Sequence, residues 1–384
     1  MLNKPVLALL SCCLMTLAMG TLHSWSVLSA DLEQALGVSR TLSSLVYSFT
    51  LVMLTLTVLF AVPLFSRLNP GQLFAGSLTL AGVGLICAGS GSVELLFVGY
   101  SGLFGIANGI GYGFALQLSA RAFSHRSGFA MGVTTAAYAL GATIGAQVLG
   151  ILVDSYGSLS TLRLHGLSFL FMAPVLAHLV AASKATYMVE AQKQKPVEID
   201  RALVMHYRVS YGFAVFAGLM AIAHATPYIQ SFESNAANDS VAVFALWGVV
   251  VLGIGNAIGG VLAGFASDKF SAKSIVTLLP AIAVVALACA AFSRSASLAL
   301  GALVVIGFTY GALIAVYPVA IGRHFGQRAS ALAYGRIFVT WGIAGLLAPV
   351  IAGALFDITQ SYRYSMLIAM ISSLISAIVA SRLK

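Results

Sequence analysis

The chain contains a long internal repeat, in which short motifs return about 202 residues further along. The segment Arg121-Ala-Phe-Ser-His-Arg126 returns as Arg323-His-Phe-Gly-Gln-Arg328, and Met19-x-x-x-His23 returns as Met220-x-x-x-His224. Solenoid proteins repeat every 20 to 50 residues, roughly, which is much shorter than this period. The sequence therefore predicts two similar halves joined in one chain.

Both halves consist mainly of long apolar segments. Hydrophobic residues make up 60% of the chain and charged residues 8%, whereas about 25% of a soluble protein is charged. About 20 apolar residues cross a bilayer as a helix, and only helices satisfy their own backbone in lipid at this segment length. We predict an all-α membrane protein with twelve transmembrane helices in two pseudo-symmetric six-helix halves. The predicted spans cover residues 6–28, 41–66, 72–90, 93–119, 127–152, 163–185, 208–231, 240–266, 274–292, 296–322, 329–354 and 362–382.

The longest polar stretch lies between the sixth and seventh spans and divides the chain. It predicts an N-terminal half over residues 1–185, a cytoplasmic linker over residues 186–207 and a C-terminal half over residues 208–384. Lys4 and the apolar run after it are similar to a signal peptide. Because eleven further spans follow, we interpret this run as the first transmembrane helix.

The basic residues predict the orientation in the membrane. With the N-terminus inside, the inner segments carry 15 of the 20 lysines and arginines and the outer segments carry 4. Positive residues concentrate on the cytoplasmic side, so we expect both termini in the cytoplasm and the protein in a bacterial-type inner membrane. The net charge of +9 follows this topology and forms no separate basic face, so no nucleic-acid partner is predicted.

Cysteines and enzymatic motifs give no sign of a cofactor. The four cysteines lie in apolar segments without the spacing of a disulfide framework or a metal finger. The sequence has no ATP-binding motif and no constellation of nucleophile and base. We expect a protein without a cofactor that is not an enzyme and that functions as a monomer in the lipid bilayer.

Two six-helix halves joined by a basic loop resemble the layout of the major facilitator superfamily. Span 4 contains Gly105-Ile-Ala-Asn-Gly-Ile-Gly-Tyr-Gly113, and spans 10 and 11 contain Tyr317-Pro318 and Trp341-Gly-Ile-Ala-Gly345. These motifs are similar to the oxalate/formate antiporter and monocarboxylate transporter branch. The resemblance implies a substrate site between the halves near mid-membrane and transport by alternating access. The clustered glycines also predict close packing of spans 4 and 5.

The chain departs from this branch at two positions that bind the carboxylate. Oxalate-type members have a basic residue in span 8 and another in span 11, where this chain has Gly260 and Trp341. The resemblance therefore implies a monocarboxylate in preference to a dicarboxylate. Ser267-Asp268-Lys269 matches the superfamily's acid-base turn after span 8. The residues predicted at the cytoplasmic gate are Arg121, Arg126, Asp268, Arg323 and Arg328.

Few charged groups lie inside the predicted spans, and none of them is an aspartate or glutamate in mid-span. Arg336 is the one lysine or arginine that lies more than two residues from the ends of a predicted span, and its repeat-related position is Thr134. An intramembrane charge usually faces the protein interior or a water-filled cavity, and a guanidinium suits a carboxylate. Arg336 is thus predicted to attract an anionic substrate or close the inner gate, unless it extends to the cytoplasmic interface.

His23 and His224 occupy equivalent places in spans 1 and 7. Three roles are open for this pair of histidines. They stabilise helix packing, they carry protons or bind substrate, or they join Met19 and Met220 as ligands of a soft metal such as Cu(I). Further polar and aromatic residues are candidates for lining a cavity. They are Tyr112, Gln117, Tyr138, Gln147, Tyr228, Asn256, Tyr310, Tyr317, Thr340 and Trp341.

The sequence as a whole predicts a secondary active or facilitative transporter. The predicted cargo is a small organic anion, in particular a monocarboxylate. One alternative is a carrier of copper or of a neutral small solute. Another is a membrane sensor that transports nothing, which would show no uptake in liposomes and would tolerate changes at Arg336 and His224.

Overall fold

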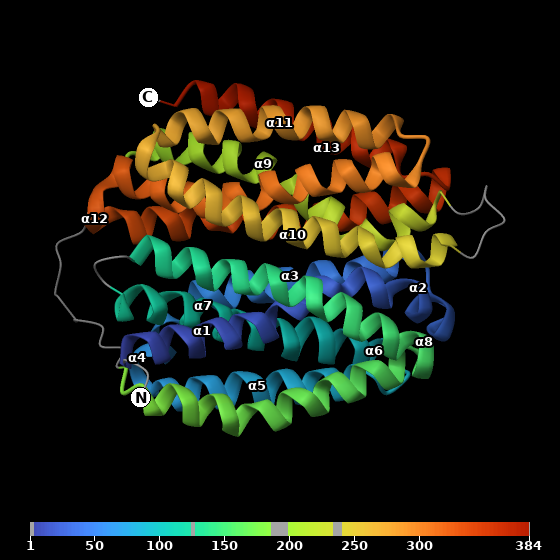
Figure 1. Cartoon of the computed structure of the whole chain (residues 1–384), viewed down its shortest axis with the longest axis horizontal. Helices are drawn as coiled ribbons and strands as arrows, with labels where there is room; N and C mark the ends of the chain where they lie inside the picture. The colour runs from blue at the N-terminus through green and yellow to red at the C-terminus, as the bar shows by residue number, and fades with distance from the viewer. Residues whose placement is uncertain (1–3, 124–126, 186–198, 233–239, 384) are drawn as a thin grey trace. The chain divides into compact units, whose positions relative to one another are not determined.

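The chain folds into long helices, and neighbouring helices within each half of the chain pack side by side (Figure 1). The computed structural model describes residues 4–123, 127–185, 199–232 and 240–383, and all regular elements in these ranges are helical. The chain divides into two compact units, Met1–Glu190 and Ala191–Lys384. The predicted all-α fold is confirmed.

The first unit contains ten helical elements among its described residues. Two of them are not α-helical: η1 is a 3₁₀-helix and η2 is a π-helix. The elements are α1 (Lys4–Gly20), η1 (Thr21–Ser24), α2 (Trp25–Leu36), α3 (Arg40–Phe60), α4 (Val62–Arg67), α5 (Pro70–Ala88), α6 (Val93–Leu96), η2 (Phe97–Phe104), α7 (Gly105–Ala122) and α8 (Ser127–Ala182).

The second unit contains five long helices in the part that the structure describes. They are α9 (Arg201–Gln230), α10 (Ser240–Lys269), α11 (Ala272–Phe292), α12 (Ala296–Thr359) and α13 (Arg363–Ser381). Helix α9 begins before the predicted start at residue 208, because Asp200 Oδ1 accepts hydrogen bonds from the backbone N–H groups of Ala202 and Leu203. Residues 201–207 of the predicted linker are therefore helical.

Two glycines with positive φ divide the longest helices into separate membrane crossings. The described residues contain eleven helices long and apolar enough to span a membrane, one of them Phe129–Ala182 with 54 residues. At about 1.5 Å per residue that helix would exceed twice the hydrocarbon thickness of about 30 Å. Gly157 breaks it, with φ 74°, and Asp31 Oδ2 then accepts a 2.8 Å hydrogen bond from Ser158 N. The eleven long helices thus provide the twelve predicted crossings.

Glycines set the closest helix contacts, but with a different partner than the sequence predicted for span 4. Gly105 and Gly109 of α7 face α3, where a Cβ at Gly109 would lie 2.7 Å from the carbonyl oxygen of Leu54. The expected packing of these glycines on span 5 is not observed. In the second unit, α10 and α12 approach closely, since a Cβ at Gly307 would lie 2.0 Å from Leu252 O. Such contacts replace the hydrophobic driving force that is absent in lipid.

Candidate functional site

The first long helix of each unit is interrupted at its histidine. In the N-terminal unit, α1 gives way to the 3₁₀ segment η1, which contains His23. In the C-terminal unit, His224 has φ −122° and ψ 15° inside α9, three residues before Pro227. A proline lacks an N–H group and disturbs the preceding turn. The repeat therefore carries a helix break together with its histidine.

Side chains from neighbouring helices satisfy the carbonyl groups around the first break. Asn108 Nδ2 of α7 donates to Met19 O at 2.7 Å, and the Tyr100 hydroxyl of η2 donates to Leu22 O at 3.2 Å. Tyr100 lies on the π-helix Phe97–Phe104, a rare conformation that is frequent at functional sites. Two irregular segments thus meet at one place in the N-terminal unit.

His23 belongs to a buried polar cluster, which we call the His23 cluster: His23, Tyr47, Asn108 and Tyr138. His23 is 7% exposed, and its Nδ1 lies 2.5 Å from the Tyr47 hydroxyl. The His23 ring meets the Tyr138 ring edge-on at 5.4 Å, and the Tyr138 hydroxyl donates to Asn108 Oδ1 at 2.9 Å. Among the described residues, no hydrogen bond reaches His23 Nε2. The cluster leaves this one nitrogen for a further contact.

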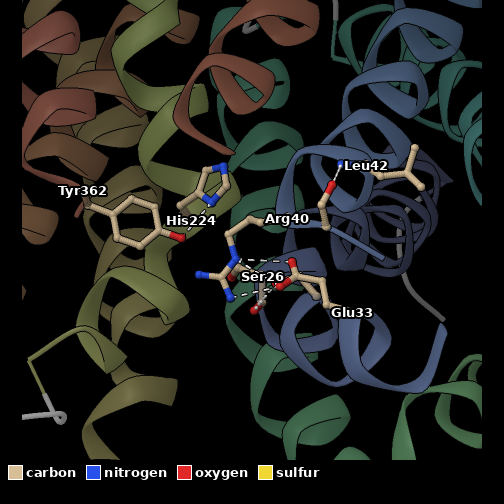
Figure 2. A network of polar contacts seen from close by, with 8 residues as sticks. Ser26, Glu33, Arg40, Leu42, His224 and Tyr362 are labelled. Atoms are coloured by element: carbon tan, nitrogen blue, oxygen red, sulfur yellow. Dashed lines mark hydrogen bonds and ion pairs between the residues drawn. The ribbon is translucent and has the colours of Figure 1, made fainter. Parts of the chain in front are cut away.

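His224 uses both ring nitrogens inside the C-terminal unit. Nδ1 lies 3.2 Å from the Tyr362 hydroxyl (Figure 2). Nε2 lies 3.0 Å from the carbonyl oxygen of Pro349. Since a carbonyl only accepts, the network assigns the proton to Nε2 and makes Nδ1 the acceptor. His224 then has no free lone pair for the Cu(I) interpretation in this structure. The described residues also contain no group of three or more His, Cys, Asp or Glu placed to hold a metal.

Replacing His224 with phenylalanine is expected to destabilise the protein by about 1–3 kcal/mol. The change removes the imidazole N–H that donates to the buried Pro349 carbonyl, and a buried polar group that loses its partner costs this much. Thermal unfolding of the purified protein in detergent measures the effect. His178→Phe is the matched control, because His178 is an exposed histidine on α8. Equal unfolding temperatures for the two variants would contradict a bracing role of His224.

Several other predicted site residues have roles in packing. Trp341 is 5% exposed, its indole N–H donates to the Tyr310 hydroxyl at 3.0 Å, and Phe338 stacks on it. Tyr317 is fully buried and hydrogen-bonds to Ser210. Asn256 lies at the α10–α12 contact, where its carbonyl oxygen would be 2.0 Å from a Cβ at Gly311.

Two of the half-buried candidates, Tyr112 and Gln117, lie on α7. Tyr112 packs its ring against Tyr138 of the His23 cluster, with 4.7 Å between ring centroids. Gln117 lies little more than one turn further along the same helix and is also half-buried. Tyr112 is therefore the predicted residue that extends the His23 cluster towards the accessible surface.

Arg336 is an exposed residue of α12. It lies ten residues beyond the break at Gly326, which is about 15 Å along the helix at 1.5 Å per residue. Its carbonyl oxygen accepts a 2.9 Å hydrogen bond from Arg208 Nε of α9. No ion pair or hydrogen bond joins its guanidinium to any residue that the structure describes. Arg336 thus presents free hydrogen-bond donors and a positive charge.

The predicted gate residues are only partly described. Arg323 Nη2 donates to the carbonyl oxygen of Ser267 at 2.6 Å, near the C-terminal end of α10, where a cation is favourable. Arg121 is exposed at the end of α7. Arg126 and the side chains of Asp268 and Arg328 lie outside the described residues. Arg323 therefore binds a helix end within its own unit.

The structure also adds residues that the sequence did not single out. Tyr47 and Asn108 complete the His23 cluster. Asn108 could have been identified from the sequence, because it is a polar residue in the middle of a glycine-rich span. Arg40 and Glu33 form the ion pair found among the described residues, with Arg40 Nη2 3.0 Å from Glu33 Oε2 (Figure 2). This pair joins the end of α2 to the start of α3 and neutralises one of the predicted outer arginines.

Comparisons with known proteins identify the family. The family model of the Major Facilitator Superfamily matches residues 9–255 and 211–384. The chain is 26% identical over 348 residues to the MFS-type transporter YhjX of Escherichia coli (strain K12), covering 86% of this chain and 83% of that protein. It is also 26% identical over 397 residues to the oxalate:formate antiporter of Oxalobacter formigenes, covering 99% of this chain and 91% of that protein.

Solved structures show the same fold at low sequence identity. A bacterial homolog of the human lysosomal transporter Spinster, inward-facing and unoccupied, matches with a TM-score of 0.72 at 14% identity over 100% of this chain and 98% of that chain. The transporter FucP in the outward conformation matches with a TM-score of 0.63 at 16% identity over all of both chains. With the family model matching both halves of the repeat, this chain belongs to the Major Facilitator Superfamily.

Proposed function

We propose that the protein carries a small monocarboxylate across a bacterial-type inner membrane by alternating access, with both termini in the cytoplasm. The observation that carries the proposal is the guanidinium of Arg336, which has no partner among the described residues. A cation at this place in a transmembrane helix usually serves a water-filled path. Its planar fork binds a carboxylate through two parallel hydrogen bonds. The relative that is named an oxalate:formate antiporter supports a carboxylate as cargo.

A monocarboxylate is favoured by what replaces the two basic residues of oxalate-type members. Gly260 has no side chain, and the Trp341 indole N–H is already bonded to Tyr310. Neither position offers a positive charge for a second carboxylate. The apolar and aromatic surroundings of Trp341 suit the uncharged end of a small organic acid.

The repeat-related helix breaks at His23 and His224 support the alternating-access part of the proposal. Irregular backbone segments such as these two breaks absorb the change in backbone angles when rigid groups of helices move. Parallel repeats that rock about a central site are the arrangement expected for this superfamily.

Reconstituted liposomes test the substrate class directly. We expect saturable uptake of at least one of labelled formate, lactate and pyruvate. Oxalate uptake should be at least about tenfold lower, because its second carboxylate lacks a charge-assisted contact, and such a contact contributes about 1.4 kcal/mol or more. Protein-free liposomes give the background. Uptake of none of the three acids above that background would refute the monocarboxylate proposal and favour the sensor alternative. Faster uptake of oxalate would refute the preference for one carboxylate.

A further inference from the structure

Arg336 has a second arginine beside it, contributed by a different helix. Arg208 lies on α9, and its Nε is 2.9 Å from the carbonyl oxygen of Arg336. This bond uses one donor of the Arg208 guanidinium and leaves both of its terminal NH₂ groups without a partner among the residues that the structure describes. The guanidinium of Arg208 therefore lies beside the backbone of α12 at the residue that carries the second arginine.

The described acidic side chains of this unit do not neutralise the two arginines. Asp200 is the N-cap of α9 and accepts hydrogen bonds from Ala202 N and Leu203 N. Asp357 lies on α12 itself, 21 residues beyond Arg336, which is about 30 Å along the helix. Two adjacent cations without a protein carboxylate favour the binding of an external anion.

The arginine pair is present in only one half of the repeat, and a neutral side chain makes the related bridge in the other half. The repeat-related position of Arg336 is Thr134, and that of Arg208 is Leu7 in the alignment that pairs His23 with His224. In the N-terminal unit the Thr134 carbonyl also accepts a hydrogen bond from the first helix, but from Thr16 Oγ1 at 2.8 Å. The same backbone position is thus bridged in both units, by a neutral hydroxyl in one and by a guanidinium in the other.

We propose that Arg208 and Arg336 form one carboxylate-binding site on the C-terminal half, close to its predicted cytoplasmic end. The Arg336 fork donates to both oxygens of the carboxylate, and the NH₂ groups of Arg208 donate to the remaining lone pairs of the same carboxylate. The bond from Arg208 Nε to the backbone oxygen of Arg336 holds the Arg208 guanidinium beside α12, which preorganises the Arg208 part of the site. This inference rests on the proposed function in that the bound carboxylate is the cargo at its point of entry or release.

Uptake kinetics and anion-dependent stability of the reconstituted or purified full chain test the site. We expect Arg208→Gln to raise the KM for formate about tenfold or more, which is the usual effect of losing one charge-assisted hydrogen bond. Arg208→Lys keeps the charge but not the planar fork, so its KM for formate should lie between those of the wild type and Arg208→Gln. The double variant with Arg336→Gln should be little worse than Arg336→Gln alone, because both residues serve one ligand. Arg201→Gln, an exposed arginine on the same helix, controls for net charge.

A thermal-shift measurement separates this site from the transport proposal. Sodium formate should raise the unfolding temperature of the wild-type protein relative to sodium chloride at equal ionic strength, and this rise should be lost in Arg208→Gln but kept in Arg201→Gln. Transport that is indifferent to Arg208 would overturn the inference and leave the proposed function standing. If formate stabilises the wild-type protein but not Arg208→Gln, and the wild-type protein takes up none of the acids, the site is upheld and the transport proposal is overturned.

A lipid phosphate is the other anion with access to two such arginines. Nanodiscs of phosphatidylcholine alone and of phosphatidylcholine with phosphatidylglycerol distinguish the two sources. We expect the formate effect in both kinds of disc. If Arg208→Gln changes only the response to phosphatidylglycerol and leaves the formate response intact, the pair binds lipid and the carboxylate site is refuted.

Discussion

Replacing Arg336 with glutamine is expected to lower the kcat/KM of formate uptake about 10- to 100-fold. The change removes a charge-assisted fork that contributes about 1.5–3 kcal/mol to binding a carboxylate, and each 1.4 kcal/mol corresponds to a factor of ten. It also removes the positive charge that attracts an anion into the membrane. Initial rates of labelled formate uptake into liposomes, taken over a range of concentrations, measure the effect.

Two comparison variants make the Arg336 experiment decisive. Arg336→Lys keeps the charge but presents a point donor in place of a planar fork, so its uptake should fall between wild type and Arg336→Gln. Arg201→Gln removes one exposed arginine from α9 and should leave uptake within a factor of about two, because exposed charges have small effects. Full uptake by Arg336→Gln would show that this arginine only extends to the lipid interface.

The fold was largely predictable because apolar runs report bilayer crossings directly. A run of about 20 apolar residues has one stable solution in lipid, so the twelve crossings could be counted from the sequence. The predicted ends of the spans were less accurate. Asp200 caps α9, so the helix begins at Arg201, within a polar stretch that was predicted to be a linker. Gly157 and Gly326, which have positive φ, separate successive crossings within α8 and α12.

The candidate site was less predictable because its chemistry depends on which helices touch. Arg208 looked like one of many cytoplasmic arginines, and only the contact of α9 with α12 brings it to Arg336. The two histidines look equivalent in the repeat, but their partners differ. Tyr362 and the Pro349 carbonyl occupy both nitrogens of His224, whereas Tyr47 occupies one nitrogen of His23.

The same limit applies to the glycines. Their spacing on span 4 predicted close packing, which the structure contains, but a glycine face has no side chain that specifies a partner. Gly105 and Gly109 accommodate α3. The sequence therefore indicates that a helix has a face for close approach, and the partner emerges only from the arrangement of all the helices in the unit.

Gly307→Ala is expected to destabilise the protein by about 1–3 kcal/mol, although alanine is the better helix former by about 1 kcal/mol. A Cβ at Gly307 would lie 2.0 Å from Leu252 O and 2.8 Å from Leu252 C. These are backbone atoms of α10, so no side-chain rotation relieves the clash, and α10 and α12 must separate. Overpacking of a close contact typically costs this amount, and here it also weakens the neighbouring contact at Gly311. Thermal unfolding in detergent provides the measurement.

Gly301 is the matched control on the same helix. It lies fewer than two turns before Gly307, and a Cβ there would meet no atom within 4 Å. Gly301→Ala therefore gains helix propensity without a clash and should unfold at the same temperature as wild type or higher. If both alanine variants were equally stable, close approach of α10 and α12 at Gly307 would not be required for stability. A loss confined to Gly307→Ala would show that stability at this position depends on the close contact between the two helices and not on glycine flexibility.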